Sequence, residues 1–320
     1  MAERIKLPIA EHRQCARVAR LYYESEMTQE EIGEFLGLSR MKVNRLLSLA
    51  MKSGIVQVEI ISPEDPYAEL ENQLLADFQL KDVRVVSAPL PGQTQGSVLA
   101  AGASAWLAGR LEPDLKIGLG LGRTVALMTQ SFTVEQPLKC HFVTLEGVGV
   151  SPNSGFAAYD VTSKLAEAAG GWAEVISAPT FVSTPAMRDA LIAEPSVAAS
   201  LKSARSANLM LQSVGTLSGD APIFRHGTLS ATDSIRLKKA GAVGDALGHF
   251  FDENGQHIPW TTDDVHIGLT LGDLANCQTS AVVAGGEEKD AAIRGGIRGK
   301  FIHALITDST TAERLLELGP

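Results

Sequence analysis

The chain has 320 residues, of which 45% are hydrophobic and 20% are charged. This length is sufficient for two domains, and the composition is that of a globular protein whose core needs no covalent staples. The three cysteines show no CxxC spacing and the seven histidines form no HxxxH or HExxH pattern, so we expect neither disulfides nor a metal site. No apolar run reaches about 18 residues and Met1 is followed by charge, which predicts a cytoplasmic protein without a membrane segment.

The net charge of −9 is distributed unevenly along the chain. Residues 1–60 contain nine Lys or Arg and eight Asp or Glu, whereas the remaining 260 residues contain 19 and 29. Residues 39–52 contain four basic side chains and no acidic one. A local basic patch on an acidic protein is expected where one face meets DNA phosphates. The alternative is an ordinary solvated helix face, and charge alone does not choose between the two.

Three short helices are predicted near the N-terminus, over residues 10–23, 29–36 and 40–52, from apolar side chains at three-and-four spacing. Thr28 and Glu31 form a capping-box sequence before the second helix, and Ser39 can cap the third. Gly37 permits the tight turn between these two helices. Residues 55–60 alternate between apolar and polar side chains, which predicts a strand that forms a small wing.

The spacing of three residues in this region favours a helix-turn-helix over a plain three-helix bundle. Gly33 provides a small residue where two helices cross, Gly37 permits the turn, and Val43 is a branched apolar residue that anchors the third helix. A bundle without a DNA role would share the apolar stripe, but it has less reason to combine these residues with a basic, acid-free helix.

DNA contacts are expected at the N-terminus of the second helix and along the third. Arginine suits guanine and asparagine suits adenine, although the sequence does not separate base contacts from phosphate contacts. The predicted contacts to double-stranded operator DNA are Thr28, Gln29, Ser39, Arg40, Lys42, Asn44 and Arg45.

A charged, proline-bearing segment at residues 62–66 predicts a domain boundary, with a DNA-binding domain at residues 1–62 and a second domain at residues 63–320. Beyond it, apolar runs alternate with helical patterns, which is typical of an α/β fold with a mainly parallel, Rossmann-like sheet covered on both faces. Strands are expected at residues 83–87, 115–119, 141–145, 173–176, 208–213, 265–269, 280–284 and 303–306, and helices at 67–78, 96–111, 125–131 and 157–169.

Glycine-rich loops follow three of these strands, at residues 118–124, 147–149 and 284–289. Ligands of parallel α/β sheets bind at the carboxyl ends of the strands, and a loop that carries Arg123, Thr124 or Lys289 suits an anion. Each loop could also be a tight turn and no more. The spacing lacks the further glycine and the acid of a dinucleotide site and contains no phosphate-binding P-loop, so we expect no nucleotide cofactor.

The sequence resembles the SorC family of sugar-binding transcriptional regulators over essentially its whole length. In the first domain the resemblance rests on the segments at residues 28–32, 38–40 and 54–56. In the second domain it rests on residues 120–124, 178–179, 241–245, 284–293 and 305–308, which occur in the family's order.

The resemblance implies a second domain similar to glucosamine-phosphate deaminase and ribose-phosphate isomerase. It also implies a homo-oligomer, often a tetramer, whose operator affinity is set by a sugar or sugar phosphate. Carried over position by position, a phosphate would be held by Lys289 and the loop that contains Gly120, Gly122, Arg123 and Thr124. Asp245 would accept hydrogen bonds from sugar hydroxyls, and Gly147 would let the backbone approach the ligand.

Two departures from the family pattern leave the effector open. Leu121 stands where many members have an aromatic residue or glycine, and residues 157–159 lack a side-chain amide found in some relatives. An unphosphorylated sugar or polyol is therefore a second possibility. The residues also have plainer interpretations: Asp245 could serve a turn, Lys289 could be a surface lysine, and Arg123 could pair at a subunit contact.

An enzyme with an accessory DNA-binding domain is the rival hypothesis. A sugar-phosphate isomerase or deaminase needs a base near the reacting carbon, and Asp245 is the only candidate that the sequence suggests. No acidic partner for Asp245 is evident in the sequence, so a regulator without catalytic residues is the preferred interpretation.

Overall fold

The computed structural model describes residues 7–56, 66–120, 122–148, 158–219, 221–225 and 228–320. The chain divides into two compact units, Met1–Asp65 and Pro66–Pro320. The predicted boundary at residue 62 and residues 57–60 of the predicted wing lie outside the described residues.

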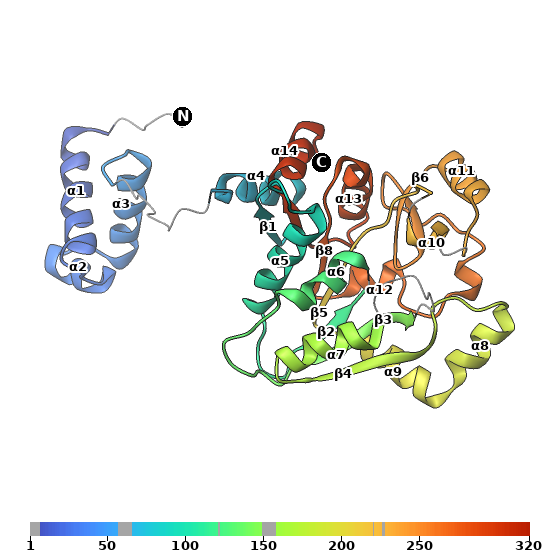
Figure 1. Cartoon of the computed structure of the whole chain (residues 1–320). Coiled ribbons are helices and arrows are strands. Elements are labelled where there is room, and N and C mark those ends of the chain that lie inside the picture. The colour runs from blue at the N-terminus through green and yellow to red at the C-terminus, as the bar shows by residue number, and fades with distance from the viewer. Residues whose placement is uncertain (1–6, 57–65, 121, 149–157, 220, 226–227) are drawn as a thin grey trace. The chain divides into compact units, whose positions relative to one another are not determined.

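The first unit contains three helices, α1 (Ile9–Tyr23), α2 (Gln29–Leu36) and α3 (Arg40–Lys52) (Figure 1). Their bounds confirm the predicted helices to within one residue. Val18, Ile32 and Val43 are fully buried in their common core. The predicted caps are present, because Thr28 forms a complete capping box with Glu31 and the Ser39 side chain accepts the N–H of the third residue of α3.

The turn between α2 and α3 depends on two glycines. Gly37 has φ = 65°, in the left-handed region that favours glycine. The N–H of Leu38 donates to the carbonyl of Gly33 at 2.8 Å, and a Cβ on Gly33 would lie 2.7 Å from the carbonyl oxygen of Leu38. The turn backbone therefore requires a residue without a side chain at position 33, which adds a reason beyond the expected helix crossing.

The second unit is built on a sheet of seven parallel strands in the order β1-β9-β8-β5-β2-β3-β4. These strands are β1 (Asp82–Val86), β2 (Lys116–Leu119), β3 (His141–Val148), β4 (Trp172–Pro179), β5 (Leu209–Gln212), β8 (Thr279–Val283) and β9 (Ala304–Asp308). A separate antiparallel hairpin consists of β6 (Ala242–Ala246) and β7 (His249–Asp252).

Helices and 3₁₀ turns connect these strands (Figure 1). The longer helices are α4 (Ala68–Phe78), α5 (Gln95–Ala108), α7 (Ala158–Ala168), α8 (Pro185–Ala193), α9 (Pro195–Arg205), α11 (Ala231–Lys239), α13 (Asp290–Arg298) and α14 (Ser309–Leu318). The shorter elements are α6 (Arg123–Leu127), η1 (Met128–Gln130), α10 (Pro222–Arg225), η2 (Asp263–Val265), α12 (Leu271–Asn276) and η3 (Glu287–Lys289).

The sheet has an apolar core on each face, as a parallel sheet covered by helices requires. Alternate residues of β5 show this directly: Leu209 and Leu211 belong to the core under α5, α6 and α7, whereas Met210 belongs to the core under α4, α9 and α13. The hairpin β6–β7 lies on the second face, where Ala246 and Phe251 join the same core as Met210.

One predicted strand is absent from the sheet, and one hairpin was missed. Residues 265–269 do not form a strand of the sheet, because η2 occupies Asp263–Val265 and the following residues make only isolated antiparallel bridges to Glu146 and Phe181. The hairpin β6–β7 was not predicted. Among the residues that the structure describes, no helix combines the length and apolar character that crossing a bilayer demands.

Candidate DNA-binding surface and effector site

The predicted DNA contacts lie in two places of the first unit, at the start of α2 and along the N-terminal half of α3. Ser39, Arg40, Lys42, Asn44 and Arg45 are all exposed. Within the described part of the chain, none of the three basic side chains forms an ion pair. The buried stripe of α3 consists of other residues, so its basic side is free to approach a polyanion.

Thr28 and Gln29 differ in how free they are to contact DNA. The hydroxyl of Thr28 donates to a carboxylate oxygen of Glu31 at 2.8 Å, and the same oxygen accepts the backbone N–H of Thr28 at 2.8 Å. Capping α2 thus occupies the polar groups of Thr28. The neighbouring Gln29, the first residue of α2, has a partly exposed side chain.

The topological switch point of the sheet lies between β2 and β5, which are adjacent and parallel. The chain leaves β2 through α6 toward β3 on one side, whereas it leaves β5 toward β8 on the other. At the carboxyl ends of such a pair of strands, the two loops lead to opposite sides of the sheet. Open α/β sheets bind ligands in the crevice between these two loops. Gly120, which follows β2, and Ser213, which follows β5, both lie at this point.

The loop after β2 contains two glycines with different surroundings. A Cβ on Gly120 would lie 2.7 Å from Cβ of Gln212 and 2.9 Å from Cδ2 of Leu247, so the packing excludes a side chain there. A Cβ on Gly122 would meet no atom of the described residues within 4 Å. Arg123, the first residue of α6, is exposed, and Thr124 is partly exposed.

Lys289 reaches this crevice from the loop after β8. Its ammonium nitrogen donates to the hydroxyl of Ser213 at 3.2 Å. Burial lowers the pKa of Lys289, and the positive charge of Arg123 lowers it further, while the carboxylates of Glu288 and Asp245 act in the opposite direction. The structure therefore brings together Lys289, Arg123 and Asp245, three residues that the sequence proposed separately.

Asp245 lies at the end of β6, next to the turn of the hairpin. One of its carboxylate oxygens accepts the N–H of Gly248 at 3.2 Å. Burial raises the pKa of Asp245 to about 6, and the nearby carboxylate of Glu146 contributes to the rise, whereas the Gly248 hydrogen bond and the charge of Lys289 oppose it. A carboxyl group in this setting can accept hydrogen bonds as an anion and gains from donors that a ligand supplies.

Gly147 lies in β3, where the neighbouring strand accounts for its lack of a side chain. A Cβ on Gly147 would overlap the carbonyl oxygen of Ala178 in β4. The N–H of Gly147 donates to the carbonyl of Ile267 at 2.9 Å, and its carbonyl accepts the hydroxyl of Thr180 at 2.5 Å. Both backbone groups of Gly147 thus have partners within the protein.

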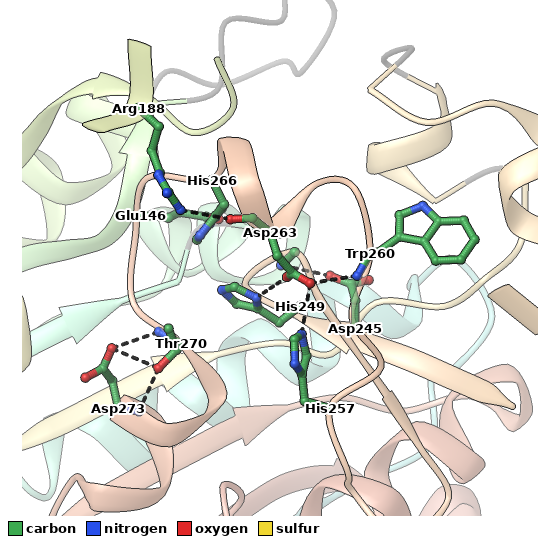
Figure 2. A network of polar contacts seen from close by, with 11 residues as sticks. Glu146, Arg188, Asp245, His249, His257, Trp260, Asp263, His266, Thr270 and Asp273 are labelled. Carbon is green, nitrogen blue, oxygen red and sulfur yellow. Dashed lines mark hydrogen bonds and ion pairs between the residues drawn. The ribbon is translucent and has the colours of Figure 1, made fainter. Parts of the chain in front are cut away.

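Several polar residues near Asp245 were missed by the sequence analysis. Gln212, the last residue of β5, is fully buried, yet neither atom of its side-chain amide has a hydrogen-bond partner among the described residues. A carboxylate oxygen of Glu146 in β3 lies 3.9 Å from Nε2 of His266, and His266 is also buried (Figure 2). The sequence could have indicated Gln212, because a polar residue ends an otherwise apolar strand. The Glu146–His266 pair depends on a contact between distant segments, which the sequence does not reveal.

A helix-turn-helix unit together with a parallel α/β unit whose switch point gathers charged side chains defines a ligand-controlled transcriptional regulator. Comparison with known proteins supports this class. The family model for a sugar-binding domain, Sugar-bind, matches residues 65–317, and the model for region 4 of sigma-70 matches residues 15–53. The chain belongs to the Sugar-bind family and is a SorC-like, sugar-controlled DNA-binding regulator.

Individual relatives cover nearly the whole chain. The transcriptional regulator LsrR of Enterobacter sp. (strain 638) is 35% identical over 321 residues, with 98% of this chain and 95% of the relative covered. LsrR of Escherichia coli (strain K12) is 34% identical over 316 residues, with 96% of each covered. The crystal structure of the full-length sorbitol operon regulator SorC from Klebsiella pneumoniae superposes with a TM-score of 0.73 at 25% identity, covering 96% of this chain and 99% of SorC.

Proposed function

We propose that the effector is a sugar, polyol or sugar phosphate that binds at the switch point and changes the affinity of the chain for an operator in a carbohydrate-catabolism operon. The observation that carries this proposal is the convergence of Lys289 with Arg123 and Asp245 above adjacent strands. The family match to a sugar-binding domain supports the chemical class.

The cationic side of the crevice suits an anionic group of the ligand. Lys289 has a hydroxyl and not a carboxylate as its hydrogen-bond partner, and Arg123 forms no ion pair with any other residue of the described chain. A Cβ on Gly122 would meet no described residue within 4 Å, which leaves room for a ligand as far as the described chain is concerned. A phosphate or similarly charged group would provide charge-assisted hydrogen bonds, which are stronger than neutral ones.

The opposite side of the crevice suits hydroxyl groups. Among the described residues, Asp245 has acceptor capacity beyond the single bond from Gly248, and Gln212 has an unpartnered donor and an unpartnered acceptor. Buried polar groups are stabilised when a partner satisfies them, and a polyol supplies both donors and acceptors at short spacing. We therefore assign Gln212 and Asp245 to hydroxyl recognition, and Lys289, Arg123 and the loop that includes Gly120, Gly122 and Thr124 to the anionic group.

Operator control requires that the effector favour one of two states of the regulator, because a ligand shifts a conformational equilibrium only through different affinities for its states. We further propose that the chain acts as a homo-oligomer, a tetramer in the arrangement that its family resemblance implies. Paired helix-turn-helix units would then read two half-sites, and the effector would set their geometry.

We infer that the effector is bound and not converted. The structure revises one premise, since Glu146 and His249 lie within electrostatic range of Asp245 and supply the polar partners that the sequence did not reveal. The regulatory role of the relatives nevertheless favours binding alone. Incubation of the protein with each bound sugar phosphate, followed by product analysis, tests this point, and turnover that disappears in Asp245→Asn would establish the enzymatic alternative.

The experiment that tests the proposed function is a thermal-shift panel of sugars, polyols and their phosphates on the purified chain. A ligand at about 100 times its dissociation constant adds roughly 2.7 kcal/mol of stability, which raises the melting temperature by several degrees. Each hit is then titrated into a complex of the protein with DNA selected by the protein from a random duplex library. A hit that changes DNA affinity supports the proposal, and a panel without any hit on folded protein contradicts it.

A further inference from the structure

A cluster of two imidazoles and one carboxylate lies beside the effector site. The residues are His249 in β7, His257 in the segment that follows, and Asp263 at the start of η2. One potential ligand atom from each of them lies within 4.8 Å of the others. No spacing in the sequence predicted this cluster, because the three residues are brought together by the fold.

The chain folds back on itself to form the cluster. After β7 the segment turns so that the N–H of Ile258 donates to the carbonyl of Phe250 at 2.8 Å and His257 bridges Phe251. This return places the ring of His257 5.7 Å from the ring of His249, centroid to centroid. Backbone pairing on both sides thus fixes the two imidazoles next to each other.

The carboxylate of Asp263 lies between the two rings (Figure 2). It is 2.7 Å from Nδ1 of His249 and 3.1 Å from Nε2 of His257, and it accepts the backbone N–H of Trp260 at 2.7 Å. The Trp260 hydrogen bond holds the carboxylate in place independently of the two histidines. Each histidine offers the carboxylate the ring nitrogen nearest to it.

The partners of the Asp263 carboxylate are two imidazoles and a backbone N–H. No lysine or arginine pairs with this carboxylate among the described residues, and the nearby Arg188 guanidinium reaches only the backbone carbonyl of Asp263 at 3.5 Å.

We propose that His249, His257 and Asp263 form a binding site for a divalent transition-metal cation, for which Zn²⁺ is the appropriate probe. Two imidazole nitrogens and one carboxylate oxygen are a donor set that such cations prefer. Donor atoms bound to one zinc ion lie about 3–3.6 Å apart. On cation binding the widest donor separation, at most 4.8 Å, therefore shortens by about 1 Å, and the 2.7 Å contact between Asp263 and His249 lengthens. The side chain of His257 is 41% exposed, which gives the cation a path from solvent and leaves a coordination position for water.

The inference does not depend on the proposed function, because it concerns a different set of side chains and its test uses neither sugar nor DNA. The test uses the full chain, stripped of metal with a chelator and freed of any affinity tag. Zn²⁺ binding is measured by calorimetry near neutral pH, and Co²⁺ is used in parallel as a spectroscopic probe of the ligand geometry.

Two variants and one control make the test specific. Asp263→Asn keeps the size of the side chain and an acceptor for the Trp260 N–H, and His257→Ala removes a half-exposed ring whose loss the fold tolerates. Either change is expected to weaken Zn²⁺ binding by about 100-fold or more. His12→Ala, at an exposed position in the other unit, controls for adventitious binding by a histidine and is expected to bind one cation per chain as the parent does.

Loss of one equivalent of Zn²⁺ in both folded variants, with visible Co²⁺ absorption only in the parent and in His12→Ala, would support the site. Two results would overturn it: no stoichiometric binding by the parent at neutral pH, or binding that is unchanged in Asp263→Asn and His257→Ala. In the first case the cluster is a hydrogen-bonded network only. Tryptophan fluorescence confirms that each variant is folded, since Trp260 is adjacent to the cluster and donates to Asp263.

Discussion

The ammonium nitrogen of Lys289 lies 3.2 Å from the hydroxyl oxygen of Ser213 and so links the loop after β8 to the loop after β5. A hydroxyl compensates a partly buried cation only weakly. Burial and the charge of Arg123 both lower the pKa of Lys289, which means that its charged form is destabilised in this structure. An anion bound beside Lys289 would reverse this effect, as the proposed effector site requires.

Lys289→Ala is expected to weaken binding of an anionic effector by about 10- to 100-fold, because hydrogen bonds to charged groups contribute about 1.5–3 kcal/mol. The folded state should not suffer, since the substitution removes a cation whose burial is unfavourable. Calorimetric titration of parent and variant with the best ligand of the sugar panel measures the change. Lys238→Ala, at an exposed position on α11, is the matched control. Equal affinities of parent and Lys289→Ala would show that Lys289 makes no contact with the ligand.

Because the pKa of Asp245 is raised, we expect the free energy of unfolding to depend on pH. Its pKa is raised from 3.8 to about 6, so the folded state holds this proton more tightly than the unfolded state does. The stabilisation of the folded state by the neutral carboxyl is complete below pH 3.8, the pKa in the unfolded chain. It is lost as the pH rises through about 6, the pKa in the folded state. The charged form costs on the order of 3 kcal/mol at neutral pH.

Asp245→Asn mimics the neutral carboxyl at every pH. The variant should therefore be more stable than the parent at pH 7, with a difference that shrinks toward zero as the pH falls toward 4, although its affinity for the effector should decrease. Urea unfolding followed by tryptophan fluorescence measures this, because Trp106, Trp172 and Trp260 all belong to the second unit. A difference in unfolding free energy that is constant over pH 4–7 would contradict the role of Asp245 protonation.

The sequence predicted those parts of the structure whose signals are local. The capping box of Thr28 and Glu31 and the left-handed turn at Gly37 are formed as expected, because each is decided within a few residues. The strands of the parallel sheet were recognisable as continuous apolar runs, since both faces of the sheet are covered.

The unpredicted parts depend on contacts between distant segments. The hairpin β6–β7 turns at Leu247 and Gly248, both with positive φ, and the sequence there lacks the Asn-Gly or Asp-Gly signal of a tight hairpin. Gln212 is left without partners by packing that only the fold establishes. The gathering of His249, His257 and Asp263 likewise follows from a chain reversal and not from any regular spacing.

Gly120 and Gly122 provide a paired test of where the ligand lies. Gly120→Ala places a Cβ 2.7 Å from Cβ of Gln212, so it should destabilise the second unit by about 1–3 kcal/mol. Gly122→Ala adds a methyl group in open space at φ = −143°, and its effect on stability should stay within about 0.5 kcal/mol.

Ligand affinity should respond to the Gly122→Ala change even though stability does not. If the anionic group binds beside Gly122, the added methyl group displaces it, and affinity should decrease by about tenfold or more while stability is preserved. Urea unfolding and ligand titration of both variants measure the two effects. Unchanged affinity in Gly122→Ala would place the ligand away from this loop.

Arg40→Ala combined with Arg45→Ala should abolish specific DNA binding and leave effector binding intact. Both side chains are exposed on α3, outside its buried stripe, so the helix should fold normally without them. Each lost phosphate contact lowers the slope of log affinity against log salt by about one, and each lost base contact costs about 1–3 kcal/mol for the selected sequence. Fluorescence anisotropy with the selected duplex, measured over a range of salt concentrations, separates these two contributions. Lys238→Ala with Lys239→Ala removes the same charge from exposed positions of the second unit and is the matched control. If this control weakened DNA binding as much as the α3 variant, net charge and not the recognition helix would determine affinity, and the assignment of α3 would be wrong.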